Sequence, residues 1–315
     1  IASGGNYNVV VGDEAGTALT TGDNNTFVGY TAGDATTTAG NNTAVGYNSL
    51  SANTEGHSNT AVGYNSLAAN TTALYNTAVG RNALDATTTG ASNVAIGYDA
   101  LGKNVSNAAN VAVGYASMED ANGSAYCTAM GYAAGKDLST GDNNLCLGYN
   151  AGASASPSGT LTTESNEICL GNDAISQAHI QVDWTVASDQ RDKTDFTALD
   201  LGLDFVKALS PVTYKWDKRS KYAEEGDDLD TVTHDGTHKE DWLDIGFKAQ
   251  EVEALEIAAG YNKSSKTNLT TTLSGDGKQY GIQYSKFVPI LVKAIQEQQT
   301  LIEALTARIT TLEGE

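Results

Sequence analysis

Residues that build a large globular core are scarce in this sequence. Only 40% of the 315 residues are hydrophobic and 7% are aromatic, whereas glycine occurs 33 times. The chain is long enough for two or three ordinary domains, but this composition excludes a conventional large core from its first half.

Basic residues are also few. There are 18 Lys and Arg against 38 Asp and Glu, a net charge of −20, so we expect neither nucleic acid nor an anionic membrane as a partner. No run approaches about eighteen apolar residues, and no signal peptide follows Ile1, which indicates no membrane insertion. Because the chain starts without Met and already in repeat register, we expect it to be the C-terminal part of a longer protein.

Cysteine occurs only three times, as Cys127, Cys146 and Cys169. The number is odd and no CxxC pair exists, so we expect small buried hydrophobic residues and neither a disulfide nor a metal site. The redox compartment is not constrained.

A short motif, NTAVGY and its variants, recurs through the first half. Its glycine returns every 17 residues over nine copies, and a tenth copy, EICLGN, follows after 23. An apolar residue precedes the glycine in all ten copies, Asn stands four positions before it in eight, and Tyr follows it in seven. The glycines are Gly12, Gly29, Gly46, Gly63, Gly80, Gly97, Gly114, Gly131, Gly148 and Gly171.

Each copy offers one short β-prone run between residues that favour turns. Seventeen extended residues trace roughly 56 Å, which suits one small coil of a β-solenoid whose rungs stack about 4.8 Å apart. Ten rungs then make a rod somewhat under about 50 Å long. The repeat predicts a stalk, and helix is excluded.

A coil this small encloses about two or three side chains, so we expect its lateral faces to need partners. Alanines beside the glycines, such as Ala61 and Ala78, would let neighbouring backbones approach, which favours a trimer of solenoids packed side by side. Period two alone leaves open which face of the strand points inward. Over residues 1 to about 171 the repeat resembles the heads of trimeric autotransporter adhesins, which are parallel β-rolls.

The second half has a different composition. Up to Gly171 there are 3 basic and 13 acidic residues, and after it there are 15 and 25, together with all three tryptophans. We therefore expect a compact domain to begin within residues 172–190.

Four motifs in this half occur in a familiar order. They are SDQRDK at 188–193, LGLDFVKALSPVTYKW at 201–216, GFKAQEVE at 246–253 and YSKFVPILVKAIQEQQ at 284–299. Together they resemble the C-terminal intramolecular chaperone domain of phage tail fibres and tailspikes, a self-cleaving Ser/Lys peptidase family. The resemblance covers about 128 residues.

The resemblance implies that this domain trimerises the fibre, directs folding of the stalk and then cuts itself off before the serine of an S-D-x-x-x-K motif. Carried onto this sequence, the scissile bond joins Ala187 to Ser188, Ser188 is the nucleophile and Lys193 is the base. Asp189 and Arg191 fill the other motif positions as orienting groups. The expected enzyme is a single-turnover serine peptidase with no external substrate and no cofactor.

The chemistry sets a condition on Lys193. A lysine accepts the serine proton only when its amine is uncharged, far below its usual pKa of about 10.4. Burial lowers that pKa and a nearby carboxylate raises it, so Asp192 weakens the assignment unless its side chain points away. If three subunits desolvate Lys193 on closing, cleavage reports completed assembly. Cleavage within one chain and cleavage between chains both remain open, and a plain polar turn is the alternative.

The last segment carries heptads. Val288, Ile295, Ile302 and Ile309 occupy one core position, and Leu291, Gln298, Leu305 and Leu312 occupy the other. This pattern predicts a parallel coiled coil from about residue 285. The Ile and Leu arrangement favours a dimer in isolated peptides, whereas the family resemblance implies a trimer. A helix packed only on its own domain is the alternative.

Other sequence patterns give weaker indications of function. His234 and His238 have a spacing seen in metal sites but lack a third ligand. GDNN at 22–25 and 141–144 is interpreted as turn chemistry rather than calcium binding. The tyrosine ladder favours packed surface or interface over glycan stacking.

The predicted fold class is mainly β followed by α+β. Residues 1–171 form a trimeric β-solenoid stalk, 172–187 a connector ending at the cleavage site, and 188–315 a mixed α/β chaperone and autopeptidase domain. We expect a homotrimeric phage tail fibre or tailspike fragment that joins an upstream fibre or baseplate protein and meets a host surface receptor. It would assemble in the host cytoplasm and reside in the virion tail fibre after the chaperone domain is released. The alternatives are a bacterial trimeric surface adhesin with a non-catalytic trimerisation foot, and a glycan depolymerase whose active site lies upstream.

Overall fold

The computed structural model describes residues 4–153, 156, 159–181, 184–223, 231–262, 269–274 and 277–314. Ile1 and Glu315, the predicted ends of the stalk and of the chaperone domain, lie outside these residues. The chain divides into two compact units, one holding the repeats up to Ser176 and one holding most of the chain from Gln177 onward. The mainly β, then α+β fold class is confirmed.

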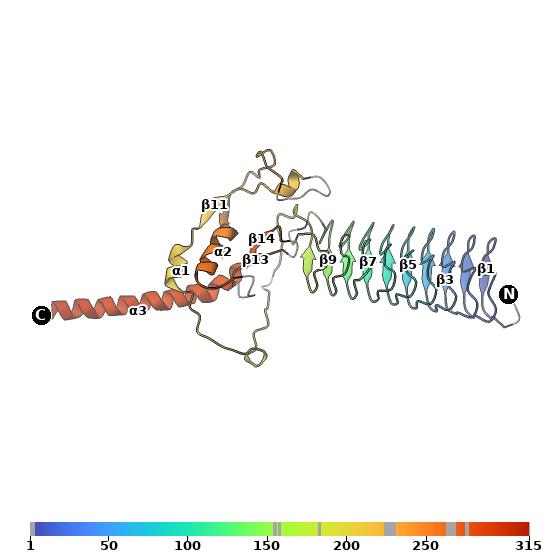
Figure 1. The fold of residues 1–315 in the computed structure, drawn as a ribbon, viewed down its shortest axis with the longest axis horizontal. Coiled ribbons are helices and arrows are strands. Elements are labelled where there is room, and N and C mark those ends of the chain that lie inside the picture. Colours follow the sequence, from blue (N-terminus) through green and yellow to red (C-terminus); the bar gives the residue numbers. More distant parts are fainter. Residues whose placement is uncertain are drawn as a thin grey trace. The chain divides into compact units, whose positions relative to one another are not determined.

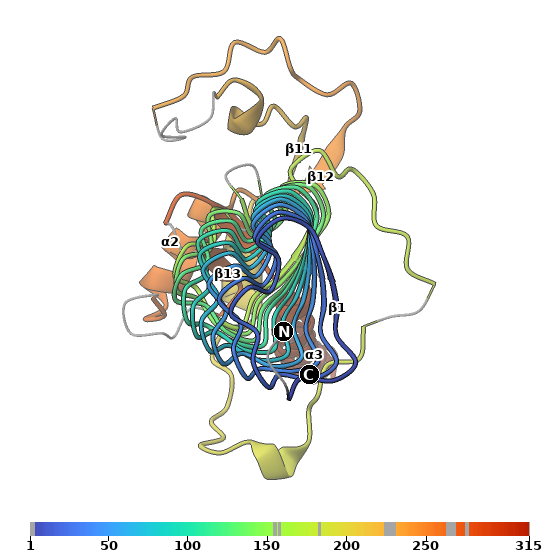
Figure 2. The same ribbon diagram turned by 90° about the vertical axis from the view of Figure 1, so that its right-hand side faces the viewer.

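The first unit is a β-solenoid whose strands form one parallel sheet in sequence order (Figure 1). Each strand pairs in register with the residues 17 positions later, as Ala61 does with Ala78, and the last step is 23. Seen along the stack, successive coils have nearly the same outline (Figure 2). The strands are β1 (Val9–Val11), β2 (Thr26–Val28), β3 (Thr43–Val45), β4 (Thr60–Val62), β5 (Thr77–Val79), β6 (Val94–Ile96), β7 (Val111–Val113), β8 (Thr128–Met130), β9 (Leu145–Leu147) and β10 (Ile168–Leu170).

The glycine that follows each strand is required by the backbone. Gly63 has φ 137°, a conformation that side chains rarely adopt. A Cβ built on it would lie 2.4 Å from the carbonyl oxygen of Gly80 in the next rung. Only glycine lets the strand turn there while neighbouring rungs remain at hydrogen-bonding distance.

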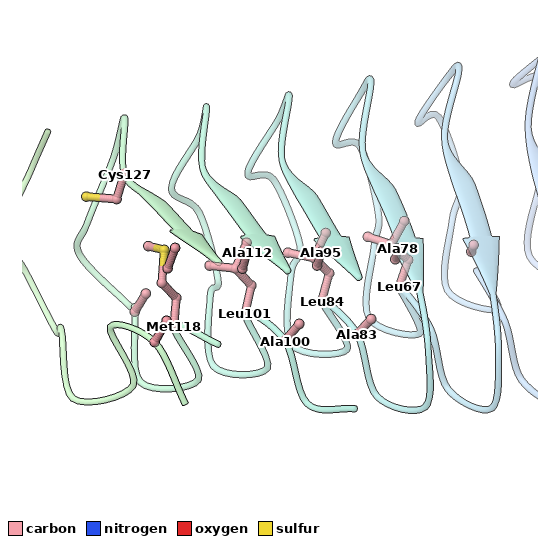
Figure 3. Close-up of a cluster of buried hydrophobic side chains, with 14 of the residues drawn as sticks. Leu67, Ala78, Ala83, Leu84, Ala95, Ala100, Leu101, Ala112, Met118 and Cys127 are labelled. Atoms are coloured by element: carbon pink, nitrogen blue, oxygen red, sulfur yellow. The ribbon is translucent and has the colours of Figure 1, made fainter. Parts of the chain in front are cut away.

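The alanine side of each strand faces the interior. Ala61 is fully buried, whereas its neighbours Thr60 and Val62 are half-buried on the outer face. Leu67, later in the same coil, closes the core from the other side, and Figure 3 shows this arrangement repeated in successive rungs. The expected role of the alanines in bringing neighbouring chains close is therefore wrong, because they pack against leucines of their own coil.

A ladder of buried asparagines ties the rungs together. The side-chain oxygen of Asn59 accepts a hydrogen bond from the backbone N–H of Asn76 at 3.0 Å, and its amide donates to the Ala73 carbonyl at 2.8 Å. Cys127 takes this position in one rung, where its Sγ donates to the carbonyl of Gly141 at 3.2 Å. All three cysteines are buried, as the sequence predicts.

The second unit contains short elements and one long helix. Its strands form two antiparallel pairs, β11 with β12 and β13 with β14. The elements are the 3₁₀ helix η1 (Gln190–Asp192), α1 (Leu203–Ala208), β11 (Val212–Tyr214), the 3₁₀ helix η2 (Arg219–Lys221), β12 (Asp244–Gly246), α2 (Ala249–Ala258), β13 (Thr271–Leu273), β14 (Tyr280–Ile282), the 3₁₀ helix η3 (Tyr284–Lys286) and α3 (Phe287–Glu313).

The core of this unit joins three helices. Phe205 of α1, Val252 of α2 and Ile290 of α3 pack in one apolar cluster with Leu201 and Phe287. α3 uses only its first turns for this packing, because its buried residues end at Ala294. No helix among the described residues combines the length and apolar character needed to cross a bilayer.

Candidate active site

A single tight turn positions the predicted peptidase residues. Asp189 caps η1, where its side-chain oxygen Oδ1 accepts the backbone N–H of Arg191 at 2.9 Å. The backbone N–H of Lys193 then donates to the Gln190 carbonyl at 3.2 Å and ends the turn. This geometry folds residue 193 back toward residue 188.

The turn brings Ser188 and Lys193 into contact. Lys193 Nζ lies 2.5 Å from Ser188 Oγ and 3.3 Å from the Ser188 carbonyl oxygen. A general base must lie within hydrogen-bond reach of the proton that it removes, and this pair meets that requirement. The distance therefore allows the Ser188 proton to pass to Lys193 once the amine is uncharged.

Asp189 and Arg191 form their own ion pair beside the contact. Arg191 Nη2 lies 2.6 Å from Asp189 Oδ2, and Nε lies 3.1 Å from Oδ1. The Arg191 side chain and backbone N–H lower the pKa of the Asp189 carboxyl, and Asp189 in turn raises the pKa of Arg191. The Asp189 charge is thus neutralised by arginine rather than by Lys193.

Asp192 does not contact the lysine. Among the described residues the Lys193 amine makes hydrogen bonds only to Ser188, and no ion pair joins it to Asp192. Asp192 therefore leaves the contact between Ser188 and Lys193 intact.

The turn is open to solvent in the single chain. Every residue from Ala187 to Lys193 is exposed. Within the described part of the chain no hydrogen-bond donor reaches the Ala187 carbonyl. In the single chain the turn brings a hydroxyl and an amine together, but it supplies neither a dry environment nor a donor for a developing oxyanion.

The predicted coiled-coil seam lies on a free face of α3. Its seven apolar positions, from Val288 to Leu312, are between 43% and 65% exposed. The opposite face of α3 packs against the rest of its domain. There, Glu297 Oε2 accepts a hydrogen bond from the backbone N–H of Leu203 at 2.7 Å. The helix packs on its own domain through one face and leaves the heptad face without a described partner.

Two polar contacts in this unit were not foreseen from the sequence. Glu297 caps α1 across 94 residues, and the buried Glu256 accepts hydrogen bonds from the side chains of Thr270 and Thr271. The sequence carries no signal for either contact. In each case the partners lie far apart in the chain, and a lone glutamate on a helix is typical of a solvated face.

The two histidines singled out in the sequence contact an aromatic ring. His238 and His234 contact the ring of Tyr222, with ring centres 4.7 and 6.2 Å away. In the described ranges no three His, Cys, Asp or Glu side chains gather in a way that could hold a metal ion.

Residues 188–261 match the family described as chaperone of endosialidase, and the match begins at Ser188. No curated protein and no solved structure matches the chain. A chaperone match behind a β-solenoid of 17-residue repeats fits a tail fibre with a C-terminal chaperone domain. The family points to a self-cleaving peptidase domain and implies trimerisation of the fibre.

Proposed function

We propose that this chain is part of a phage tail fibre or tailspike whose C-terminal domain trimerises and folds the stalk and then releases itself between Ala187 and Ser188. The observation that carries the proposal is the 2.5 Å contact of Lys193 Nζ with Ser188 Oγ, at the residue where the family match begins. The stalk would remain in the virion, joined to an upstream fibre or baseplate protein and facing a host surface receptor.

The proposed reaction is an acyl shift followed by hydrolysis. The uncharged Lys193 amine accepts the proton of the Ser188 hydroxyl, and Ser188 Oγ attacks the carbonyl carbon of Ala187. The bond from that carbon to the Ser188 nitrogen breaks, and the nitrogen takes the proton from Lys193. Water then hydrolyses the ester between Ala187 and Ser188 Oγ, which leaves a carboxylate at Ala187 and a free amine with an intact hydroxyl at Ser188.

Adjacency of nucleophile and carbonyl favours cleavage within one chain. The reacting groups belong to neighbouring residues, so the step is unimolecular, and effective molarities of about 10⁵ M or more are accessible to well-oriented groups. No pocket for an external substrate is needed.

Assembly is the proposed trigger. A lysine acts as a base only when uncharged, and desolvation lowers its pKa from the usual value of about 10.4. In the single chain the turn is exposed, so neighbouring copies that close over it would remove water from Lys193 and supply donors to the Ala187 carbonyl. The exposed heptad face of α3 supports such copies.

The test compares the full chain with Ser188→Ala and Lys193→Met, by intact mass and size-exclusion light scattering. We expect the wild type to yield a fragment that begins at Ser188, and both variants to stay intact and trimeric. Thr194→Ala, which removes the neighbouring exposed hydroxyl, is the matched control and is expected to cleave normally. A folded wild-type trimer that remains full length would rule out autoproteolysis and leave a non-catalytic trimerisation domain.

A further inference from the structure

The outer face of the solenoid sheet is a ladder of side chains that are almost all uncharged. In the coil of β4, Thr60 and Val62 point outward from the strand, and Tyr64 follows at the next alternate position. We call these three positions, in the eight coils of β2–β9, the ladder face. Their side chains are half-buried to exposed in the single chain.

The tyrosines of the ladder face cover one another. The rings of Tyr47 and Tyr64 stack with centres 5.1 Å apart, and those of Tyr115 and Tyr132 at 4.8 Å. A sugar that stacks on an aromatic ring needs a free ring face. Inside these stacks the tyrosines of the neighbouring rungs already cover the ring faces. The ladder face therefore presents ring edges and hydroxyl groups along a regular row.

Charge is almost absent from this surface. Of its 24 positions, three in each of eight coils, only Arg81 is charged, although the chain carries a net charge of −20. The Arg81 guanidinium lies between two rings, 5.7 Å from the centre of Tyr64 and 5.3 Å from that of Tyr98. Two copies of an acidic chain repel each other wherever their carboxylates come close. The ladder face carries no carboxylate, so two copies can approach through it without this repulsion.

We propose that the ladder face is the surface through which identical chains pack against each other along the stalk. The inference rests on the trimer of the proposed function and assigns its contact surface in the solenoid. Chains that share a parallel coiled coil run in the same direction, so equal 17-residue steps bring identical rungs level with each other. A different partner would not need to match this spacing over eight coils.

The ladder face supplies part of the area that a stable contact needs. Eight rungs at about 4.8 Å and three alternate positions cover roughly 500 Å². A stable interface buries about 800 Å² on each partner, and the exposed heptad face of α3 contributes further area. Side chains pointing outward in the strand, and not the buried alanines, provide this contact.

The test measures distances between chains by spin labelling in the full chain carrying Ser188→Ala. Val62→Cys places a label on the ladder face, and Thr72→Cys, exposed in the same coil but outside it, is the matched control. The native cysteines are buried, so they should remain unlabelled. Packed sheets lie roughly 10 Å apart, so we expect a short, narrow distance for position 62 and a longer one for position 72.

The outcomes separate this inference from the proposed function. A trimer in light scattering with no short distance at position 62, or with the shorter distance at position 72, overturns the assignment of the ladder face and leaves the trimer standing. A monomer overturns both. If Val62→Cys does not fold, Val113→Cys at the equivalent position of β7 gives the same readout.

Discussion

Glu297 of α3 accepts a hydrogen bond from the backbone N–H of Leu203, the first residue of α1. The carboxylate also pairs with Lys293, four residues earlier on the same helix, at 3.3 Å. A Cβ on Gly202 would lie 2.2 Å from the Glu297 side chain, so the glycine before α1 makes room for this contact. One carboxylate thus fixes the long helix against the start of α1.

This contact predicts a pH dependence of stability. The hydrogen bond from Leu203, followed by the interaction with Lys293, lowers the pKa of Glu297 below its usual value of 4.5. A carboxyl with a lower pKa in the folded state stabilises the fold above its unfolded pKa, and the effect is lost as pH falls through the folded value. We expect Glu297→Gln to lower the unfolding temperature at pH 7 and to have a smaller effect below about pH 4.

The control for this prediction is Glu303→Gln, which changes an exposed glutamate on the same helix that bonds only to Gln299 in the described contacts. It should leave the pH profile unchanged. Equal effects of the two substitutions, measured by circular dichroism melting across pH, would show that the contact with Leu203 contributes nothing.

Gly63→Ala tests the steric requirement of the coil. The new Cβ would meet the Gly80 carbonyl oxygen at 2.4 Å in a backbone conformation with φ 137°. Strain of this kind costs about 2–4 kcal/mol, so we expect a clear loss of solenoid stability in urea. Gly102→Ala, where φ is not positive and the nearest backbone atom is 3.2 Å away, should cost much less.

Asn76→Ala tests the buried ladder. The Asn76 side chain accepts the backbone N–H of Asn93 at 2.9 Å and donates to the Gly90 carbonyl at 2.8 Å. Alanine leaves both backbone groups buried without a partner, at about 1–3 kcal/mol each. Asn76→Cys should be milder, because in its own rung the Cys127 Sγ accepts the backbone N–H of Asn144 at 3.4 Å and donates to the Gly141 carbonyl at 3.2 Å. A cysteine variant as unstable as the alanine variant would contradict this account.

Periodicity in the sequence predicted the solenoid because every rung has the same local requirement, which is a glycine at the turn after a short strand. It did not predict which strand face points inward, since alternation fits both directions. The sequence also did not reveal that a large side chain at one position of a coil compensates for a small residue at another. Gly33 stands where the next four rungs have leucine, and a Cβ on it would lie 2.7 Å from the Phe27 ring, which fills that space.

The site followed from the sequence for a different reason. Ser188 and Lys193 are five residues apart, so one turn suffices to join them. A short sequence motif therefore contains both partners of the contact. The Glu297 contact with Leu203 depends on how α1 and α3 pack, and no local pattern encodes a separation of 94 residues.

Ile302→Asp tests the heptad face. Ile302 is 48% exposed in the single chain and lies outside the apolar cluster of its own domain, so the substitution leaves that cluster intact. A charged residue at a coiled-coil core position opposes association, and we expect fewer trimers in light scattering and slower release of the fragment at Ser188. Thr306→Asp lies outside the two core positions and is expected to assemble normally. Full assembly of the Ile302 variant would mean that α3 does not join the copies.

Arg191→Gln tests how the motif keeps its own aspartate from disabling the lysine. Arg191 holds the Asp189 carboxylate through its Nη2 at 2.6 Å. Without the guanidinium, that charge is left unneutralised four residues from Lys193, and a nearby carboxylate raises the pKa of a lysine. The proposed base must be uncharged, so we expect cleavage to slow at neutral pH and its rise with pH to move to higher values. Adding Asp189→Asn to Arg191→Gln removes the unpaired charge and should move the profile back. A rate that falls equally at every pH, and is not restored in the double variant, would show that the ion pair only shapes the turn.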